Sequence, residues 1–186
     1  MPFSSSQTSC RCDSATATDA RLGRRLLLGM AAAGAAASLL SGRANSAPGT
    51  YDALLLTCID PRFPEHTLNY MRGRGLAGKY SEISLAGAAI AVVAAPFKDW
   101  RPVFWENLGA SIALHAVPKV IVLDHRECGA AELAYGREAV SSRDRENETH
   151  EKVFEKFRSA IKDRYPKLAV ETALMALDGS VRVFDD

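Results

Sequence analysis

The sequence predicts an α/β domain with a mostly parallel central sheet flanked by helices. Past Pro48, segments with strand character alternate with segments of helical period, as in chains of strand–helix–strand units. Two of the strand segments, 53–57 and 120–123, are short continuous apolar runs. Such runs are typical of strands that are buried on both faces of a parallel sheet. The length of 186 residues suits one domain of this kind.

The first half of the domain reads as strand, helix, strand. After the strand at 53–57, Pro64 suits the first turn of a helix over 64–71, and Gly73 then favours its end. A second strand is predicted at 81–85. The following stretch, 87–95, is apolar and rich in small residues, and its period is ambiguous.

The second half continues the alternation up to a final pair of strands. A helix over 105–116 ends before Pro118 and leads into the strand at 120–123, and a further helix begins near Gly129. The charged stretch 136–148 is predicted to be a surface loop, and an amphipathic helix over 149–165 follows it. The last strands, 168–177 and 181–184, are separated by a tight turn.

Residues 1–47 have the layout of a signal peptide, and residues 48–186 form the predicted domain. Arg24 and Arg25 precede a run of fifteen uncharged residues, 26–40, which is shorter than the roughly 20 residues of a membrane span. We therefore expect no permanent membrane span, and cleavage near Ala47. The arginine pair before a leucine run resembles a twin-arginine signal, which implies export of the folded protein to the periplasm. An ordinary secretory signal and an uncleaved amphipathic leader are the alternatives.

Two short motifs follow the two apolar strands. The first is Cys58-Ile59-Asp60-Pro61-Arg62, in which an extended backbone would place Cys58, Asp60 and Arg62 on one face. The second, residues 124–129, carries His125 and Cys128 at the start of a predicted helix, whose amino terminus favours the thiolate form of Cys128. Because ligands bind at the carboxyl edge of an open α/β sheet, these side chains are expected to converge there.

Two cysteines and one histidine are a zinc-ligand set, and three protein ligands leave the fourth tetrahedral position open for water. The sequence thus predicts a catalytic Zn²⁺ site made by Cys58, His125 and Cys128. Cys10 and Cys12 fall in the leader, so a disulfide between Cys58 and Cys128 is the other use that an exported protein could make of its cysteines.

Cys-x-Asp-x-Arg after one strand and His-x-x-Cys-Gly after a later one resemble the metal-binding motifs of β-class carbonic anhydrases. The resemblance implies the fold of that family, Cys58, His125 and Cys128 as zinc ligands, and a homodimer. It also implies that Asp60 lies beside the metal, as a hydrogen-bond acceptor or a fourth ligand, with Arg62 as its partner. Where relatives usually carry an Arg-Asn-Ala-Gly segment, this chain has the apolar residues 85–89.

The predicted activity is reversible hydration of carbon dioxide to bicarbonate by a zinc-bound hydroxide. Asp60 would accept the hydrogen bond of the hydroxide, Arg62 would keep Asp60 ionised, and the stretch 87–93 would offer an apolar wall to a small nonpolar substrate. Hydrolysis of carbonyl sulfide or carbon disulfide fits the same chemistry. A zinc-binding protein without turnover is the alternative that the apolar residues 85–89 favour.

Composition and charge point away from a nucleic-acid partner. The formal net charge is +1, 24% of the residues are charged, and basic residues are scattered among acidic ones. Arg126 and Glu127 are expected to be solvated, and His150 is expected to lie at the surface. The predicted partner is therefore a small molecule.

Overall fold

The computed structural model describes residues 49–184 of the chain. The predicted signal peptide, with Arg24, Arg25 and the uncharged run at 26–40, lies outside the described residues. Within the described part, no helix combines the length and the apolar character that crossing a membrane requires.

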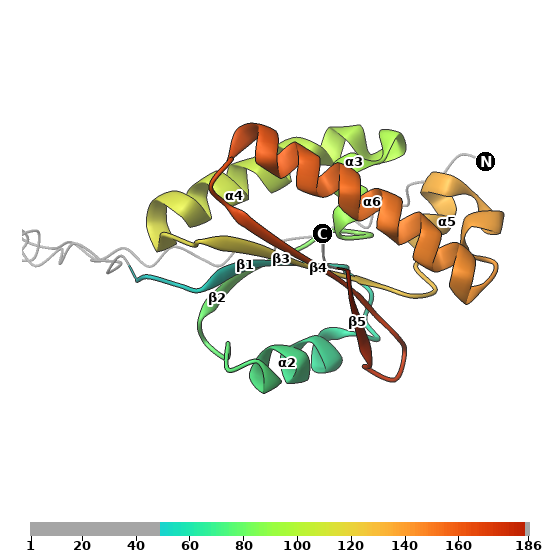
Figure 1. Ribbon diagram of the computed structural model, residues 1–186, viewed down its shortest axis with the longest axis horizontal. Helices are drawn as coiled ribbons and strands as arrows, with labels where there is room; N and C mark the ends of the chain where they lie inside the picture. The colour runs from blue at the N-terminus through green and yellow to red at the C-terminus, as the bar shows by residue number, and fades with distance from the viewer. Residues whose placement is uncertain (1–48, 185–186) are drawn as a thin grey trace, which may run out of the picture. The chain divides into compact units, whose positions relative to one another are not determined.

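A five-stranded sheet runs through the centre of the domain (Figure 1). The strands are β1 (Ala53–Thr57), β2 (Tyr80–Ser84), β3 (Lys119–His125), β4 (Ala169–Met175) and β5 (Val181–Phe184). Their order across the sheet is β2-β1-β3-β4-β5, with parallel pairing throughout except between β4 and β5. The mostly parallel sheet that the sequence predicts is confirmed.

The two apolar runs form the middle of the sheet. Every residue of β1 is buried, and β3 is buried from its second residue onward. Side chains of β1 alternate between two core clusters, with Leu54 and Leu56 in one and Ala53 and Leu55 in the other. Burial on both faces explains why these strands show no polar alternation in the sequence.

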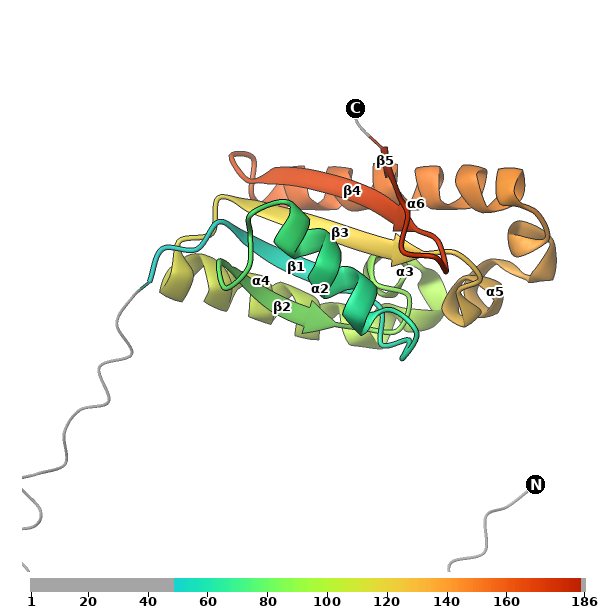
Figure 2. The same ribbon diagram turned by 90° about the horizontal axis from the view of Figure 1, so that it is seen from below.

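Helices cover both faces of the sheet (Figures 1 and 2). One face carries α3 (Ala89–Val93), α4 (Arg101–His115), α5 (Gly129–Tyr135) and α6 (Arg143–Arg164). The opposite face carries α2 (Pro64–Gly73). Two short 3₁₀ helices, η2 (Ala95–Trp100) and η3 (Arg137–Val140), lead into α4 and α6. The larger core cluster lies under the four-helix face, where Phe104 of α4 packs against Phe157 of α6.

The structure corrects the starts of two helices and settles one open assignment. The helix predicted over 105–116 is α4, which already begins at Arg101. The charged stretch 136–148 is not a loop, because it contains η3 and the first turns of α6, which begins at Arg143. Ser142 caps that helix by accepting a hydrogen bond from the backbone N–H of Arg145 at 3.3 Å. The ambiguous stretch 87–95 holds α3, whose residues from Ala89 to Val92 are buried.

The order of the strands creates a switch point beside β1. The chain passes from β1 to β2 on one side and returns to β3 on the other, so β1 and β3 are neighbours in register from Leu54 opposite Val120 to Thr57 opposite Leu123. In open α/β sheets, ligands bind in the crevice at the carboxyl ends of the strands at such a point. Both sequence motifs begin at this edge.

Candidate metal centre

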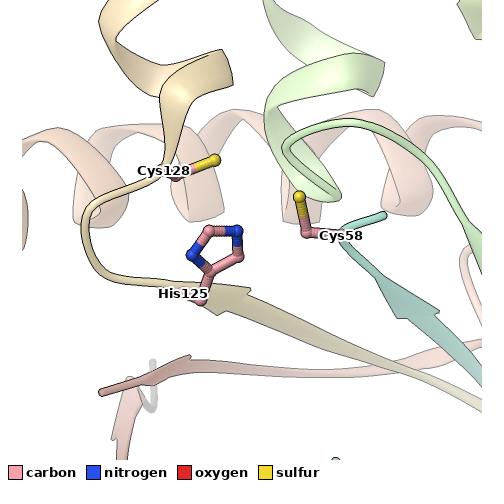
Figure 3. A group of neighbouring side chains, drawn as sticks. All are labelled: Cys58, His125 and Cys128. Carbon is pink, nitrogen blue, oxygen red and sulfur yellow. The ribbon is translucent and has the colours of Figure 1, made fainter. Parts of the chain in front are cut away.

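Cys58, His125 and Cys128 meet at the carboxyl ends of β1 and β3. Cys58 directly follows β1, His125 is the last residue of β3, and Cys128 is the residue that precedes α5. Their ligand atoms all lie within 4.8 Å of one another, and the three side chains point into the same space (Figure 3). Since zinc holds sulfur at about 2.3 Å and nitrogen at about 2.0–2.1 Å, small side-chain adjustments would let the three atoms hold one ion.

The imidazole of His125 is oriented as a metal ligand requires. Its Nδ1 donates to the backbone carbonyl of Arg126 at 2.8 Å, which leaves the lone pair on Nε2. The ring is 3% exposed and stacks on Phe63 at a centroid distance of 4.2 Å. Within residues 49–184, Nε2 has no hydrogen-bond partner although it is buried. A buried nitrogen lone pair needs a partner, and a metal ion bound between this nitrogen and the two sulfur atoms would supply one.

The two thiols are free, and each shifts the pKa of the other. The hydrogen bond from Cys128 lowers the pKa of Cys58, His125 lowers it further, and so does the backbone N–H of Gly87, which donates to the Cys58 sulfur at 3.1 Å. The same hydrogen bond raises the pKa of Cys128, and burial raises it further. A thiol that binds zinc loses its proton, so the expected thiolate form of Cys128 stays a prediction for the metal-bound chain.

Asp60 and Arg62 form a forked ion pair at the edge of the cluster. Arg62 Nη2 donates to Asp60 Oδ2 at 2.8 Å, Nε donates to Oδ1 at 3.0 Å, and the Arg62 backbone N–H also donates to Oδ1. These donors lower the pKa of Asp60 to about 2. Asp60 Oδ2 lies 3.8 Å from His125 Nε2. The predicted neighbourhood of Asp60, Arg62 and His125 is present, and a role of Asp60 as ligand or catalytic group stays a prediction.

Polar contacts around the second motif are more extensive than the sequence indicates. The expectation of a solvated Arg126 is wrong, because its side chain is 12% exposed and donates to Glu146 at 3.0 Å and to Asn147 at 2.7 Å. The expectation of a surface His150 is also wrong, because it is 1% exposed and its Nδ1 donates to Asp124 at 2.8 Å. Both corrections have one cause, which is that α6 begins six residues earlier than predicted and packs its first turns against this motif.

The apolar residues from Ala88 to Val92 are buried, and all but Ala91 belong to the core cluster that also contains Cys128 and contacts Cys58. Their role toward a substrate stays a prediction. A cavity of about 40 Å³ adjoins Cys58 and His125, and polar side chains of Thr57, Thr67 and Glu82 help to line it. A cavity of this size has room for about three water molecules.

Comparison with known proteins gives sequence relatives and a fold match. No family model matches the chain. An uncharacterized protein of Rickettsia bellii is 35% identical over 128 residues, which cover 69% of this chain and 78% of the relative. An uncharacterized protein of Rickettsia conorii is 34% identical over 128 residues, covering 69% of each chain.

Among solved structures, the crystal structure of a carbonic anhydrase from Streptococcus mutans aligns with 88% of this chain and 100% of its own. The TM-score is 0.50 and the sequence identity is 17%, so the match supports the fold alone. It agrees with the predicted fold class, an α/β domain like that of the β-carbonic anhydrases. Because it is 35% and 34% identical to them over 128 residues, the chain belongs to the same protein family as the two uncharacterized Rickettsia proteins.

Proposed function

We propose that the chain is a zinc enzyme that catalyses the reversible hydration of carbon dioxide to bicarbonate. The observation that carries the proposal is the cluster of two sulfur atoms and one imidazole nitrogen within 4.8 Å, with the Asp60 carboxylate 3.8 Å from that nitrogen. The match to a solved carbonic anhydrase supports the proposal through the fold.

The donor set suits a catalytic zinc rather than a structural one. Cys58, His125 and Cys128 would supply three of four tetrahedral ligands, whereas structural sites use four protein ligands. When bound, zinc would act as a Lewis acid that lowers the pKa of a water molecule from about 15.7 toward about 7. The chain's own contribution is to bind and orient the reactants around that position.

Asp60 is the residue that we assign to orienting the water. Its carboxylate is ionised and accepts hydrogen bonds, so it can hold the O–H of the attacking water and direct the oxygen lone pair toward the carbon of carbon dioxide. Arg62 fixes the carboxylate by its forked contact and keeps it aimed at the cluster. As the new C–O bond forms, one C=O electron pair moves to oxygen and the proton of the water passes to solvent.

An Asp60→Asn variant tests this assignment. It should retain about one zinc per chain, because the three ligand side chains are unchanged, while its stopped-flow hydration rate falls on the order of 10²–10⁴-fold. Cys58→Ala is the matched control that should lose zinc and activity together. If wild type hydrates carbon dioxide and Asp60→Asn does so equally fast, Asp60 and Arg62 have a purely structural role.

A non-catalytic zinc-binding protein is the second candidate. The apolar residues 85–89, which stand where the resemblance leads one to expect polar groups, are the observation that favours it. A wild-type chain that binds zinc but neither hydrates carbon dioxide nor hydrolyses carbonyl sulfide or carbon disulfide would favour this candidate over the enzyme.

A further inference from the structure

We propose that Glu146 and His150 of α6 are positioning residues for the metal centre. Glu146 holds the loop between His125 and Cys128, and His150 holds the turn that faces Cys58. The proposal rests on the proposed zinc site but not on its hydration activity. Glu146 and His150 are one helical turn apart, so they lie on the same face of α6, and they are 4% and 1% exposed.

His150 acts through Asp124, the residue before His125. Its Nδ1 donates to Asp124 Oδ2 at 2.8 Å, and Asp124 is itself 1% exposed. The other carboxylate oxygen, Oδ1, accepts the backbone N–H of Ala89 at 3.0 Å. One buried carboxylate thus ties the end of β3 to the first residue of α3, and His150 fixes the orientation of that carboxylate.

The tie reaches Cys58 through the turn before α3. Gly87 and Ala88 both have positive φ angles, 81° and 47°, and Gly87 donates its backbone N–H to the Cys58 sulfur at 3.1 Å. A positive φ is unfavourable for alanine, so this turn needs an external restraint to keep its shape. The hydrogen bond from Ala89 to Asp124 supplies that restraint.

Glu146 holds the other side of the centre. Its Oε1 accepts the backbone N–H of Glu127 at 2.6 Å, and its Oε2 accepts from Arg126 at 3.0 Å. Glu127 has a φ of 54°, which is a rare conformation for a residue with a long side chain. Since Glu127 directly precedes Cys128, the carboxylate of Glu146 stabilises the backbone conformation that turns this cysteine toward Cys58 and His125.

Fold stability alone does not account for His150. Its Nε2 is buried and has no hydrogen-bond partner within the described residues. A buried imidazole with an unpaired nitrogen costs free energy that an apolar ring of similar shape would not cost. Replacing a buried polar pair by apolar side chains is often neutral or stabilising. What an apolar ring cannot do is orient Asp124.

The test measures zinc affinity in the full-length chain by competition with a chromophoric chelator. Groups that orient metal ligands typically change metal affinity by about 10–100-fold when they are removed, so His150→Phe should weaken zinc binding by about that factor. His150→Asn should recover most of the affinity, because its side-chain N–H can donate to Asp124. The visible absorption of the Co²⁺-loaded chain should shift in His150→Phe and return toward wild type in His150→Asn.

Two further variants separate positioning from packing. Val153→Ala removes buried volume from the same helix but makes no polar contact with the motif, so it should lower stability and leave zinc affinity within about 2-fold of wild type. Glu146→Ala should weaken zinc binding as His150→Phe does, and Glu146→Gln should weaken it less because one acceptor oxygen remains. Glu146→Ala also carries the test if His150→Phe does not fold.

Three outcomes would overturn the proposal. Wild-type affinity in both His150→Phe and Glu146→Ala would show that neither residue acts on the centre. Equal losses in His150→Phe and His150→Asn would assign the effect of His150 to ring packing. A wild-type chain that binds no zinc would overturn the zinc site and this proposal together, whereas zinc binding without hydration would overturn the enzyme alone.

Discussion

Gly87 borders the metal cluster at a position that has little room for a side chain. Its φ of 81° lies in the region that favours glycine, and a Cβ built on it would come within 2.8 Å of the Cβ of Ala130. Its backbone N–H also donates to the Cys58 sulfur at 3.1 Å. The absent side chain is therefore what allows the turn to approach both α5 and the cysteine.

Gly87→Ala should lower the free energy of unfolding by about 1–3 kcal/mol, through backbone strain and overpacking against Ala130. Urea unfolding of wild type and variant measures the loss. Gly75→Ala is the matched control, because Gly75 has a φ of 70° but a Cβ added to it would meet no atom of residues 49–184 within 4 Å, so only strain applies. Equal losses at the two positions would contradict the proposed contact with Ala130.

The convergence of the three candidate ligand side chains was predictable, and the partner of Asp124, the residue before His125, was not. Cys58 and His125 each come at the end of an apolar run, and parallel strands bring such ends to one edge. The hydrogen bond between His150 and Asp124 spans 26 residues, and a spacing rule within either motif does not reach it. A signal for His150 was nonetheless present, since it lies three residues before Val153 and seven before Phe157, on the apolar face.

The start of α6 and the helical character of residues 87–95 were hard to predict, and each has a local explanation. The start of α6 is easily missed because a charged run suggests a loop, although Ser142 followed by Asp144 and Glu146 is a pattern typical of a helix start. The period of residues 87–95 is ambiguous because α3 has five residues, too few to show a 3.6-residue repeat, and four of them are buried.

Glu171 joins three elements on the α2 side of the sheet. It lies in β4 and accepts hydrogen bonds from Lys119 at the start of β3 and from Arg74 just after α2. Burial raises the pKa of Glu171, but these two donors outweigh burial and leave the pKa below its ordinary value. A carboxylate with a lowered pKa stabilises the fold above its unfolded-state pKa, and this stabilisation is lost as the pH falls.

We therefore expect wild type to be more stable than Glu171→Gln at neutral pH, and the difference to shrink as the pH falls below about 4.3, the ordinary pKa of a glutamate. Urea unfolding at several pH values between about 3 and 7 measures this difference. A difference that does not change with pH would mean that the carboxylate charge of Glu171 contributes nothing.

Residues 1–47 carry the sequence features of a signal peptide. We propose that residues 1–47 export the chain to the periplasm by the twin-arginine route, which would let the cysteines take up metal before they meet an oxidising compartment. Homodimerisation also stays a prediction. The export route has a direct genetic test.

Replacing Arg24 and Arg25 together by Lys keeps the charge of the leader and should leave the precursor in the cytoplasm if export depends on the arginine pair. Cell fractionation with detection of precursor and mature chain measures the outcome. Arg43→Lys, which lies outside the pair, is the control and should leave export unchanged. Normal export of the double variant would favour the general secretory route instead.

Zinc K-edge X-ray absorption on the purified full-length chain, combined with its metal content, would show whether Cys58, His125 and Cys128 hold one zinc ion with an open position. We expect about one zinc per chain, with two sulfur ligands at about 2.3 Å, one imidazole nitrogen at about 2.0–2.1 Å and one oxygen ligand. A zinc-free chain with Cys58 and Cys128 joined in a disulfide, or a zinc held by four sulfur atoms, would rule out this site.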